Sequence, residues 1–378
     1  DLDSFPTRLS SDRMLKDWGS WDEDFRDLTK KLRKNLLSLL GKSKNLYDCV
    51  PIQGSGTFAV ESMLGTFIPK DGKLLVLANG AYGLRAAQTM DYLNRDYHLL
   101  DKGDYLPPRG GEVADILEND KAITHVLVIH CETSSGILNP LEEISAVVKS
   151  AGRKLLIDSM SAFGAVPVDP EKIDFEAMVS SANKCIEGVP GFGFVFAKLS
   201  ALRAAKGNCH SLSLDVEAQW SAMEKSGQWR FTPPTHVVAA FLTALEIHEE
   251  EGGVAGRGAR YTNNRDVMVS GMRDLGFETL LDERWLSPII VTFFCPADPA
   301  FEFKKFYDLM KSEGYIIYPG KLTVVDSFRI GCIGRMDAHV MKGVVFAAKK
   351  ALETMGVESA APPEAAFLER QRLSELQE

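Results

Sequence analysis

The sequence predicts an α/β fold in which a large domain with a mostly parallel sheet precedes a smaller α+β domain. The first observation is a set of short apolar runs, rich in Val, Ile and Leu, with helix-length segments between most of them. Such uninterrupted runs are typical of strands buried on both faces of a parallel sheet. They lie at residues 74–78, 126–129, 155–157, 178–179 and 192–197. The second observation is that, from about residue 263, fewer strands alternate with longer helices.

The helices are predicted from apolar residues that recur every three or four positions. Residues 22–40 form the first, with Phe25, Leu28, Leu32, Leu36 and Leu39 on one face. A second helical pattern follows a Gly-rich turn at 53–57. In the C-terminal part the pattern predicts helices at 264–275, 301–313 and 337–355, and strands at 289–294, 315–318 and 327–332.

These elements divide the chain into four segments. We expect an N-terminal arm at 1–21, a large α/β domain at 22–262, a small α+β domain at 263–356 and a tail at 357–378. The segment 357–378 is charged after its Pro-Pro pair, which leaves open a tail, a linker remnant or a surface helix. The chain begins at Asp1 without Met, which leaves open that the true N-terminus is missing or processed.

Composition argues against several classes of partner. The net charge of −9 and the lack of a long basic run predict no nucleic-acid partner. No apolar stretch approaches the roughly 18 residues that suggest a membrane span. The six cysteines are scattered, with no C-x-x-C pair and no His/Cys spacing that would bind zinc. We therefore expect no metal and a reducing compartment, the cytoplasm, although an organelle stays open.

The most informative residue is Lys184. It follows an apolar run and small residues, and a Gly/Pro-rich loop comes next. Partial burial of a lysine disfavours its charged ammonium form. The neutral amine is then free to form a Schiff base with pyridoxal phosphate. Asp158 ends an apolar strand 26 residues upstream, where a carboxylate is costly unless it is paired. The two together are the minimal set for this cofactor, with Asp158 for the pyridinium nitrogen and Lys184 for the aldehyde. Taken singly, Asp158 could cap the next turn and Lys184 could be a surface lysine.

The turn containing Ser55, Gly56 and Thr57 precedes a helix and predicts an anion site. Backbone N–H groups and the helix dipole favour a phosphate there, and the two hydroxyls can donate. The turn lacks the third Gly of a dinucleotide fingerprint and does not match a Walker loop, which makes a nucleotide-binding dehydrogenase a distant alternative. A plain tight turn is the simpler interpretation of this motif alone.

Two further loops follow predicted strands. Tyr82 lies in a Gly-flanked loop and can stack on a planar ring, or simply fill the core. Thr133 belongs to a group of hydroxyls that can bind a cofactor or substrate. The neighbouring His130 and Cys131 point to opposite faces of their strand, so we expect packing or supporting roles for them. Because ligands of open α/β sheets bind outside the carboxyl ends of the strands, all these loops are candidates for one site.

Arg329 alternates with Phe328 and Ile330 on a predicted strand of the small domain. Its planar guanidinium either reaches the solvent or binds a carboxylate, phosphate or phosphonate.

Taken together, these motifs closely resemble the 2-aminoethylphosphonate:pyruvate transaminase family, in the alanine–glyoxylate/serine–pyruvate branch of the fold-type I, class V aminotransferases. The resemblance covers about residues 20–355. The matching strings are Gln-Gly-Ser-Gly-Thr at 53–57, Asn-Gly-Ala-Tyr-Gly at 79–83, Glu-Thr-Ser-Ser-Gly-Ile-Leu-Asn-Pro at 132–140, Ser-Ser-Ala-Asn-Lys-Cys-Ile-Glu-Gly-Val-Pro-Gly-Phe at 180–192, Ser-Leu-Ser-Leu-Asp at 211–215, Trp-Arg-Phe-Thr-Pro-Pro-Thr-His at 229–236, Ile-Tyr-Pro-Gly-Lys at 317–321 and Phe-Arg-Ile-Gly at 328–331.

The resemblance implies a pyridoxal 5'-phosphate enzyme with a mostly parallel seven-stranded sheet. It implies that 2-aminoethylphosphonate and pyruvate are converted to phosphonoacetaldehyde and L-alanine in phosphonate metabolism. Lys184 would carry the cofactor as a Schiff base, and Arg329 would bind the acid group of the substrate. Thr232 would reach the cofactor phosphate of the neighbouring subunit, so that a homodimer is the functional unit. The resemblance also implies that Asp158 pairs with the pyridinium nitrogen, that Tyr82 stacks on the ring and that Thr133 lies beside it. Ser55, Gly56 and Thr57 would hold the phosphate.

Two departures keep alternatives open. The family begins with a Thr-Pro-Gly-Pro segment, and this chain has none before Phe5-Pro6-Thr7. The position before Ser-Leu-Ser-Leu-Asp is usually Arg in the family and is His210 here. An alanine–glyoxylate or serine–pyruvate type of aminotransferase, or a weakly active truncated module, are therefore the alternatives.

Overall fold

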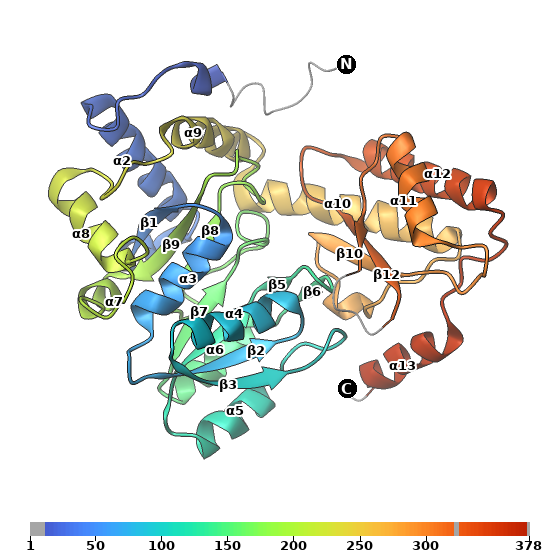
Figure 1. Ribbon diagram of the computed structural model, residues 1–378, viewed down its shortest axis with the longest axis horizontal. Coiled ribbons are helices and arrows are strands. Elements are labelled where there is room, and N and C mark those ends of the chain that lie inside the picture. Colours follow the sequence, from blue (N-terminus) through green and yellow to red (C-terminus); the bar gives the residue numbers. More distant parts are fainter. Residues whose placement is uncertain (1–11, 321–324, 376–378) are drawn as a thin grey trace.

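Figure 1 shows the protein as a computed structural model, which describes residues 12–320 and 325–375. The Phe5-Pro6-Thr7 segment, most of the predicted arm, Lys321 of the 317–321 string and the last three residues of the tail lie outside the described residues. Within the described range the arm contains one short 3-10 helix, η2 (Asp12–Leu15). No helix of the described part is long and apolar enough to cross a membrane.

A seven-stranded sheet forms the centre of the large domain. β9 runs antiparallel to both of its neighbours, and the strands from β8 to β3 are parallel to one another. This confirms the predicted α/β architecture with a mostly parallel sheet. The strands lie in the order β1 (Tyr47–Gln53), β9 (Phe192–Lys198), β8 (Ala177–Ser181), β7 (Lys154–Asp158), β4 (Ile123–Ile129), β2 (Lys73–Ala78) and β3 (Asp96–Asp101).

The sequence pattern missed the two edge strands, β1 and β3. An edge strand bonds to one neighbour only and is less buried, so its residues need not be continuously apolar. β3 has only exposed and half-buried positions and begins and ends with aspartate. β1 contains Pro51, which is tolerated because an edge strand does not need every backbone N–H for the sheet.

Helices cover both faces of the sheet, and a separate cluster of buried apolar residues lies on each face. One cluster joins the sheet to α2 (Glu23–Ser38), α5 (Gly110–Asn119), α6 (Leu141–Ser150) and α9 (Thr235–Glu250). The other joins it to α3 (Gly56–Phe67), α4 (Ala81–Tyr92), α7 (Leu199–Ala204) and the start of α8 (Val216–Ser226). The strands are therefore buried on both sides, which is why they are continuously apolar. The short elements η3 (Gly41–Leu46), β5 (Cys131–Glu132) and β6 (Ile137–Leu138) complete this part.

The smaller part packs two helices on an antiparallel sheet with the order β10-β12-β11. Its elements are η4 (Glu283–Trp285), β10 (Ile290–Phe294), α11 (Phe303–Ser312), β11 (Tyr318–Pro319), β12 (Ser327–Gly331) and α12 (Ala338–Met355). The strand predicted at 315–318 is wrong in its position, because the chain becomes extended only at Tyr318. The tail forms a surface helix, α13 (Glu364–Glu375), which is anchored where Arg370 donates to the Thr279 carbonyl at 2.8 Å.

The long helix α10 (Gly253–Asp274) connects the two parts (Figure 1). The pattern predicted only its second half, from Asn264, because glycines weaken the helical signal before it. Close packing explains the glycine at position 258, because a Cβ there would lie 2.4 Å from the carbonyl oxygen of Ala165 in the large domain. The predicted domain boundary at 262/263 falls inside this helix and stays a prediction.

Candidate active site

A cavity of about 240 Å³ opens at the carboxyl ends of the parallel strands. It brings together seven residues that the sequence singled out, although they are spread over 130 positions of the chain. These are Ser55, Gly56, Thr57, Tyr82, Thr133, Asp158 and Lys184. The other residues of the wall are Val60, Arg85, Ile129, Cys131, Met160, Ser161, Ser181 and Asn183. β4 and β7 end at this cavity, with Ile129 and Asp158, and β8 ends there with Ser181.

Asp158 is a buried carboxylate at the floor of the cavity. Its Oδ1 accepts a hydrogen bond from the Met160 amide at 2.9 Å. Burial raises the pKa of this carboxyl from 3.8 to about 6, against the opposing effect of the Met160 hydrogen bond. An ionised Asp158 is therefore stabilised by any cation that enters the cavity beside it.

Lys184 lies in a tight turn just after β8 and is half-buried. Two backbone hydrogen bonds shape the turn, from Glu187 to the Lys184 carbonyl and from Gly188 to the Ala182 carbonyl, both at 2.9 Å. Glu187 has a φ of 60°, which is rare for a residue with a side chain. The amine thus projects from a short, held loop rather than from a free surface.

The N-terminus of α3 faces the cavity at Ser55, Gly56 and Thr57. Ser55 is the residue before the first turn, yet its side chain makes no capping hydrogen bond within the described structure. The first N–H groups of the helix and the Ser55 and Thr57 hydroxyls are therefore available to bind an anion in the cavity. Gly193 of β9 permits this arrangement, because a Cβ there would lie 2.8 Å from Ala59 of the same helix.

Two residues that the sequence reasoning missed hold the Tyr82 loop. The buried Glu132 carboxylate accepts from the amides of Tyr82, at 2.9 Å, and of Gly83, at 3.2 Å. Ser134 Oγ accepts from the Ala81 amide at 3.0 Å and donates to Glu132 at 2.5 Å. Together they cap the start of α4. A carboxylate directly after a predicted strand was the available signal, since such a buried charge needs partners.

Arg85 is a further residue of the wall that the sequence reasoning did not single out. Its guanidinium carbon lies 4.6 Å from the centroid of the Tyr82 ring, one helical turn away. The placement fits a cation–π contact, which supports one face of the ring.

Arg329, on β12, does not itself line the cavity but contacts its wall at Thr133. Its Nη1 donates to the carbonyl oxygen of Thr133 at 2.7 Å, and its Nε donates to the Pro319 carbonyl at 3.1 Å. Burial lowers the pKa of Arg329, while Tyr82, Glu132 and Tyr318 act in the opposite direction. The guanidinium is therefore held at the rim, next to a residue of the wall.

Thr232 and His210 do not line the cavity. Both are exposed, in the segment between β9 and α9. Thr232 stands shortly before α9, and His210 precedes the Ser-Leu-Ser-Leu-Asp string, whose Asp215 caps α8 by accepting from the Ala218 amide at 3.0 Å.

His130 is buried, and its Nδ1 lies 2.9 Å from Ser159 Oγ. Burial lowers the pKa of His130 to about 4, so the ring is neutral at physiological pH. Cys131 lines the cavity, and burial raises the pKa of its thiol to about 12, so it is no nucleophile at neutral pH. All six cysteines are free. Among the described residues, no cluster of three or more His, Cys, Asp or Glu side chains could hold a metal.

Comparison with known proteins supports this geometry. The family model for class-V aminotransferases matches residues 54–299, which include every residue that lines the cavity. The chain belongs to the class-V aminotransferases. A relative named 2-aminoethylphosphonate–pyruvate transaminase, from Rhizobium meliloti (strain 1021), is 69% identical over 96% of this chain and 95% of its own length. Another named 2-aminoethylphosphonate–pyruvate transaminase 1, from Paraburkholderia xenovorans (strain LB400), is 64% identical over 97% of this chain and 94% of its own length.

A solved structure shows the same fold. The pyridoxamine–pyruvate aminotransferase from Mesorhizobium loti superimposes with a TM-score of 0.84, at 21% identity, and covers 98% of this aminotransferase chain and 94% of its own. The predicted fold-type I architecture is confirmed by this likeness.

Proposed function

We propose that this aminotransferase converts 2-aminoethylphosphonate and pyruvate to phosphonoacetaldehyde and L-alanine, with pyridoxal 5'-phosphate as its cofactor. The observation that carries the proposal is the meeting of Lys184, Asp158 and the α3 N-terminus in one cavity. The names of relatives that are 69% and 64% identical support the choice of substrates.

The cavity fits this cofactor on three grounds. Ser181 Oγ is buried on the wall, and the described residues offer it no hydrogen-bond partner, so a bound ligand would satisfy it. The uncapped start of α3 suits a phosphate group. The buried Asp158 suits a protonated ring nitrogen, which would repay the cost of keeping the carboxylate ionised. Pyridoxal phosphate, when bound, would supply an electron sink and carry the amino group from donor to acceptor.

The residues then divide the work by position. Ser55, Gly56 and Thr57 would hold the phosphate, and Tyr82 and Thr133 would lie against the ring. Asp158 would keep a proton on the ring nitrogen. The Lys184 amine would hold the cofactor aldehyde and, once displaced by the substrate amine, take the proton from the amine-bearing carbon of the donor and return it on the cofactor side.

Arg329 would bind the acid group of either substrate. Its fork suits the phosphonate of 2-aminoethylphosphonate and the carboxylate of pyruvate, and its contact with Thr133 places it beside the ring site. A single arginine can thus serve both half-reactions, because both substrates present an anionic group near the reacting carbon.

A single-turnover absorbance experiment tests cofactor, donor and acceptor separately. The purified protein, loaded with pyridoxal phosphate, should lose its yellow colour with 2-aminoethylphosphonate alone and regain it when pyruvate is added. A protein that binds the cofactor but responds only to alanine or serine would instead establish the alternative amino donors. A protein that pyridoxal phosphate cannot reconstitute would contradict the proposal as a whole.

The matched variants are Lys184→Ala and Lys206→Ala. We expect the first to lower turnover by about 10³-fold or more, because it removes both the covalent attachment and the base. Lys206 is exposed and does not line the cavity, so its variant should keep wild-type turnover. Normal turnover by Lys184→Ala would exclude the assigned role.

The homodimer, the reach of Thr232 into a neighbouring site and the cytoplasmic location remain predictions. The exposure of Thr232 in the single chain supports a role at a subunit interface, since its hydroxyl is free to meet a partner's phosphate.

A further inference from the structure

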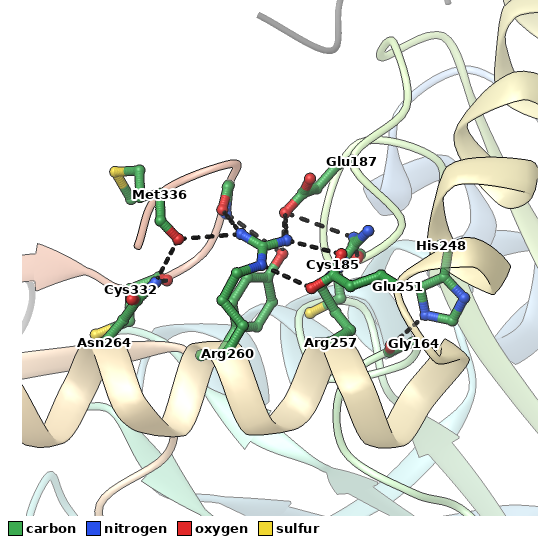
Figure 2. A network of polar contacts seen from close by, with 12 residues as sticks. Gly164, Cys185, Glu187, His248, Glu251, Arg257, Arg260, Asn264, Cys332 and Met336 are labelled. Atoms are coloured by element: carbon green, nitrogen blue, oxygen red, sulfur yellow. Dashed lines mark hydrogen bonds and ion pairs between the residues drawn. The ribbon is translucent and has the colours of Figure 1, made fainter. Parts of the chain in front are cut away.

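The two halves of the proposed site are held by one polar network. Lys184 lies on a turn of the large domain, and Arg329 lies on β12 of the small one. Figure 2 shows the Arg260 guanidinium above α10, between Glu187 on one side and Met336 on the other. Glu187 is three residues beyond Lys184, and Met336 follows β12 by a short loop. The network therefore contacts both the chain segment that carries Lys184 and the segment that follows Arg329.

The Lys184 turn is held at two points by α10. The Glu187 Oε1 accepts from Arg260 Nη2 at 2.9 Å and from the Tyr261 hydroxyl at 2.6 Å. The fully buried Arg257 donates from Nη1 to the carbonyl oxygen of Cys185, the residue after Lys184. Glu187 adopts a left-handed backbone that most side chains avoid, and these contacts add to the two backbone hydrogen bonds that shape the turn.

The loop after β12 is held by the same stretch of helix. Arg260 Nη1 donates to the carbonyl oxygens of Gly334 and, at 3.2 Å, Met336. The Tyr261 hydroxyl accepts from the Gly334 amide at 3.3 Å. Asn264 Nδ2 donates to the carbonyls of Cys332, at 3.2 Å, and Met336, at 2.8 Å.

The charges in this network are compensated. Glu251 accepts from Arg257 Nε and Arg260 Nε, both at 2.7 Å, so each guanidinium is fixed in orientation. Burial by itself would lower the pKa of Arg260, but hydrogen bonds and charges from Glu251 and Glu187 outweigh it and raise the pKa. Arg260 and Tyr261 differ from their neighbours on α10. The guanidinium of the first and the hydroxyl of the second each contact both the Lys184 turn and the loop after β12.

We propose that Arg260 and Tyr261 are positioning residues that hold the Lys184 turn and the Arg329 strand in one fixed relation. The inference rests on the proposed roles of Lys184 and Arg329. If so, the binding of the substrate's acid group by Arg329 and the position of the Lys184 amine depend on the same contacts. Neither residue touches the reacting atoms.

The test uses Tyr261→Phe and Arg260→Lys, with Arg273→Lys as the control. Tyr261→Phe removes one hydroxyl and keeps the volume. Arg260→Lys keeps the charge but loses the planar fork that reaches both loops. Arg273 is on the same helix, but its guanidinium contacts Thr279 and Glu283, within the small domain only.

The first readout is hydrogen exchange of the protein without cofactor, which does not depend on activity. We expect the amides of the 182–188 turn and of the 332–336 loop to exchange about tenfold faster in both variants, the size expected for the loss of one hydrogen bond to a charged group. The amides of β4 should be unchanged in both variants, and the two segments should be unchanged in the Arg273→Lys control. Faster exchange in one segment only, in neither, or evenly throughout the sheet would overturn the proposal.

The second readout covers both ends of the site. We expect the KM for 2-aminoethylphosphonate to rise about tenfold, and the rate at which added pyridoxal phosphate attaches covalently to Lys184 to fall, in both variants. A change at one end without the other would contradict the coupling. If the wild type is inactive with 2-aminoethylphosphonate, the proposed function fails, while hydrogen exchange still decides the positioning role.

Discussion

At the scale of single residues, burial decides what the cavity can do. The Asp158 carboxylate is buried, and burial raises its pKa to about 6. His130, buried nearby, is shifted the other way and stays neutral. Desolvation disfavours the charged form in both cases, but it leaves Asp158 titrating close to neutral pH. The residue is therefore poised to pair with a cation that the cavity binds.

Keeping an ionised carboxylate buried costs folding free energy. We therefore expect Asp158→Asn to be more stable than wild type in the protein without cofactor. Because the folded-state pKa lies above the ordinary value of 3.8, stability that is full below about pH 4 is lost as the pH rises to 6 and beyond. At pH 7.5 the variant should resist urea unfolding better than wild type, by up to roughly 3 kcal/mol. At pH 4.5 the difference should shrink.

The same variant should bind pyridoxal phosphate more weakly, because an amide cannot pair with a protonated ring nitrogen. Asp71→Asn, at an exposed position, is the control and should change neither property. Equal stability of Asp158→Asn and wild type at both pH values would show that the carboxyl is not strained by burial.

At the scale of elements, the start of α4 is built from another loop. Glu132 and Ser134 accept hydrogen bonds from three successive amides, those of Ala81, Tyr82 and Gly83. The carboxylate also matches the positive end of the helix dipole. Tyr82 is thus positioned by residues about fifty positions away in the sequence, and hydrogen bonds join the Thr133 loop to the Tyr82 loop.

The absence of a side chain at Gly80 lets Glu132 and Ser134 approach the start of α4, so we expect a larger residue at this position to be damaging. Its φ is 154°, and a Cβ would lie 2.2 Å from Ser134 Oγ and 2.6 Å from Glu132 Cγ. Gly80→Ala should therefore displace the cap, destabilise the fold by about 2 kcal/mol or more, and weaken cofactor binding through Tyr82. Thermal unfolding and cofactor titration measure the two effects.

Gly111→Ala is the matched control, because a Cβ there meets nothing within 4 Å. It lies in the first turn of α5, where alanine is the better helix former, so the variant should be neutral or slightly more stable. If both substitutions behaved alike, the close approach at Gly80 would not be what limits this position.

At the scale of the whole molecule, the site is assembled by long-range contacts. Arg329 reaches the Thr133 carbonyl across 196 positions, and α10 joins the two parts of the chain. Thr232, by contrast, stays exposed and apart from the cavity of its own chain. A second subunit is the arrangement in which its predicted role could be carried out.

Mixed dimers give a direct test of that role. Thr232→Ala alone should bind pyridoxal phosphate more weakly, by about 1–3 kcal/mol if a hydrogen bond to the phosphate is lost. Mixing it with inactive Lys184→Ala chains should restore one site of wild-type affinity per dimer, because the intact Lys184 then faces an intact Thr232. Absence of rescue would place Thr232 within its own subunit or outside the site.

The sequence by itself determined the parallel sheet and the residues at its carboxyl ends. Both follow from local rules: strands buried on two faces are continuously apolar, and the loops after them meet at one edge. The motifs around Ser55, Tyr82, Asp158 and Lys184 were therefore predictable, and the structure places all four in one cavity.

Only the tertiary structure decided the rest. The edge strand β3 has no buried position, and β1, although mostly buried, is interrupted by Asp48 and Pro51, so neither leaves a continuous apolar pattern. The cap of α4 by Glu132 and the bridge from Arg260 to two distant loops depend on which segments the fold brings together. Buried polar groups find partners by proximity in space, and proximity between segments far apart in the chain leaves no periodic signal in a single sequence.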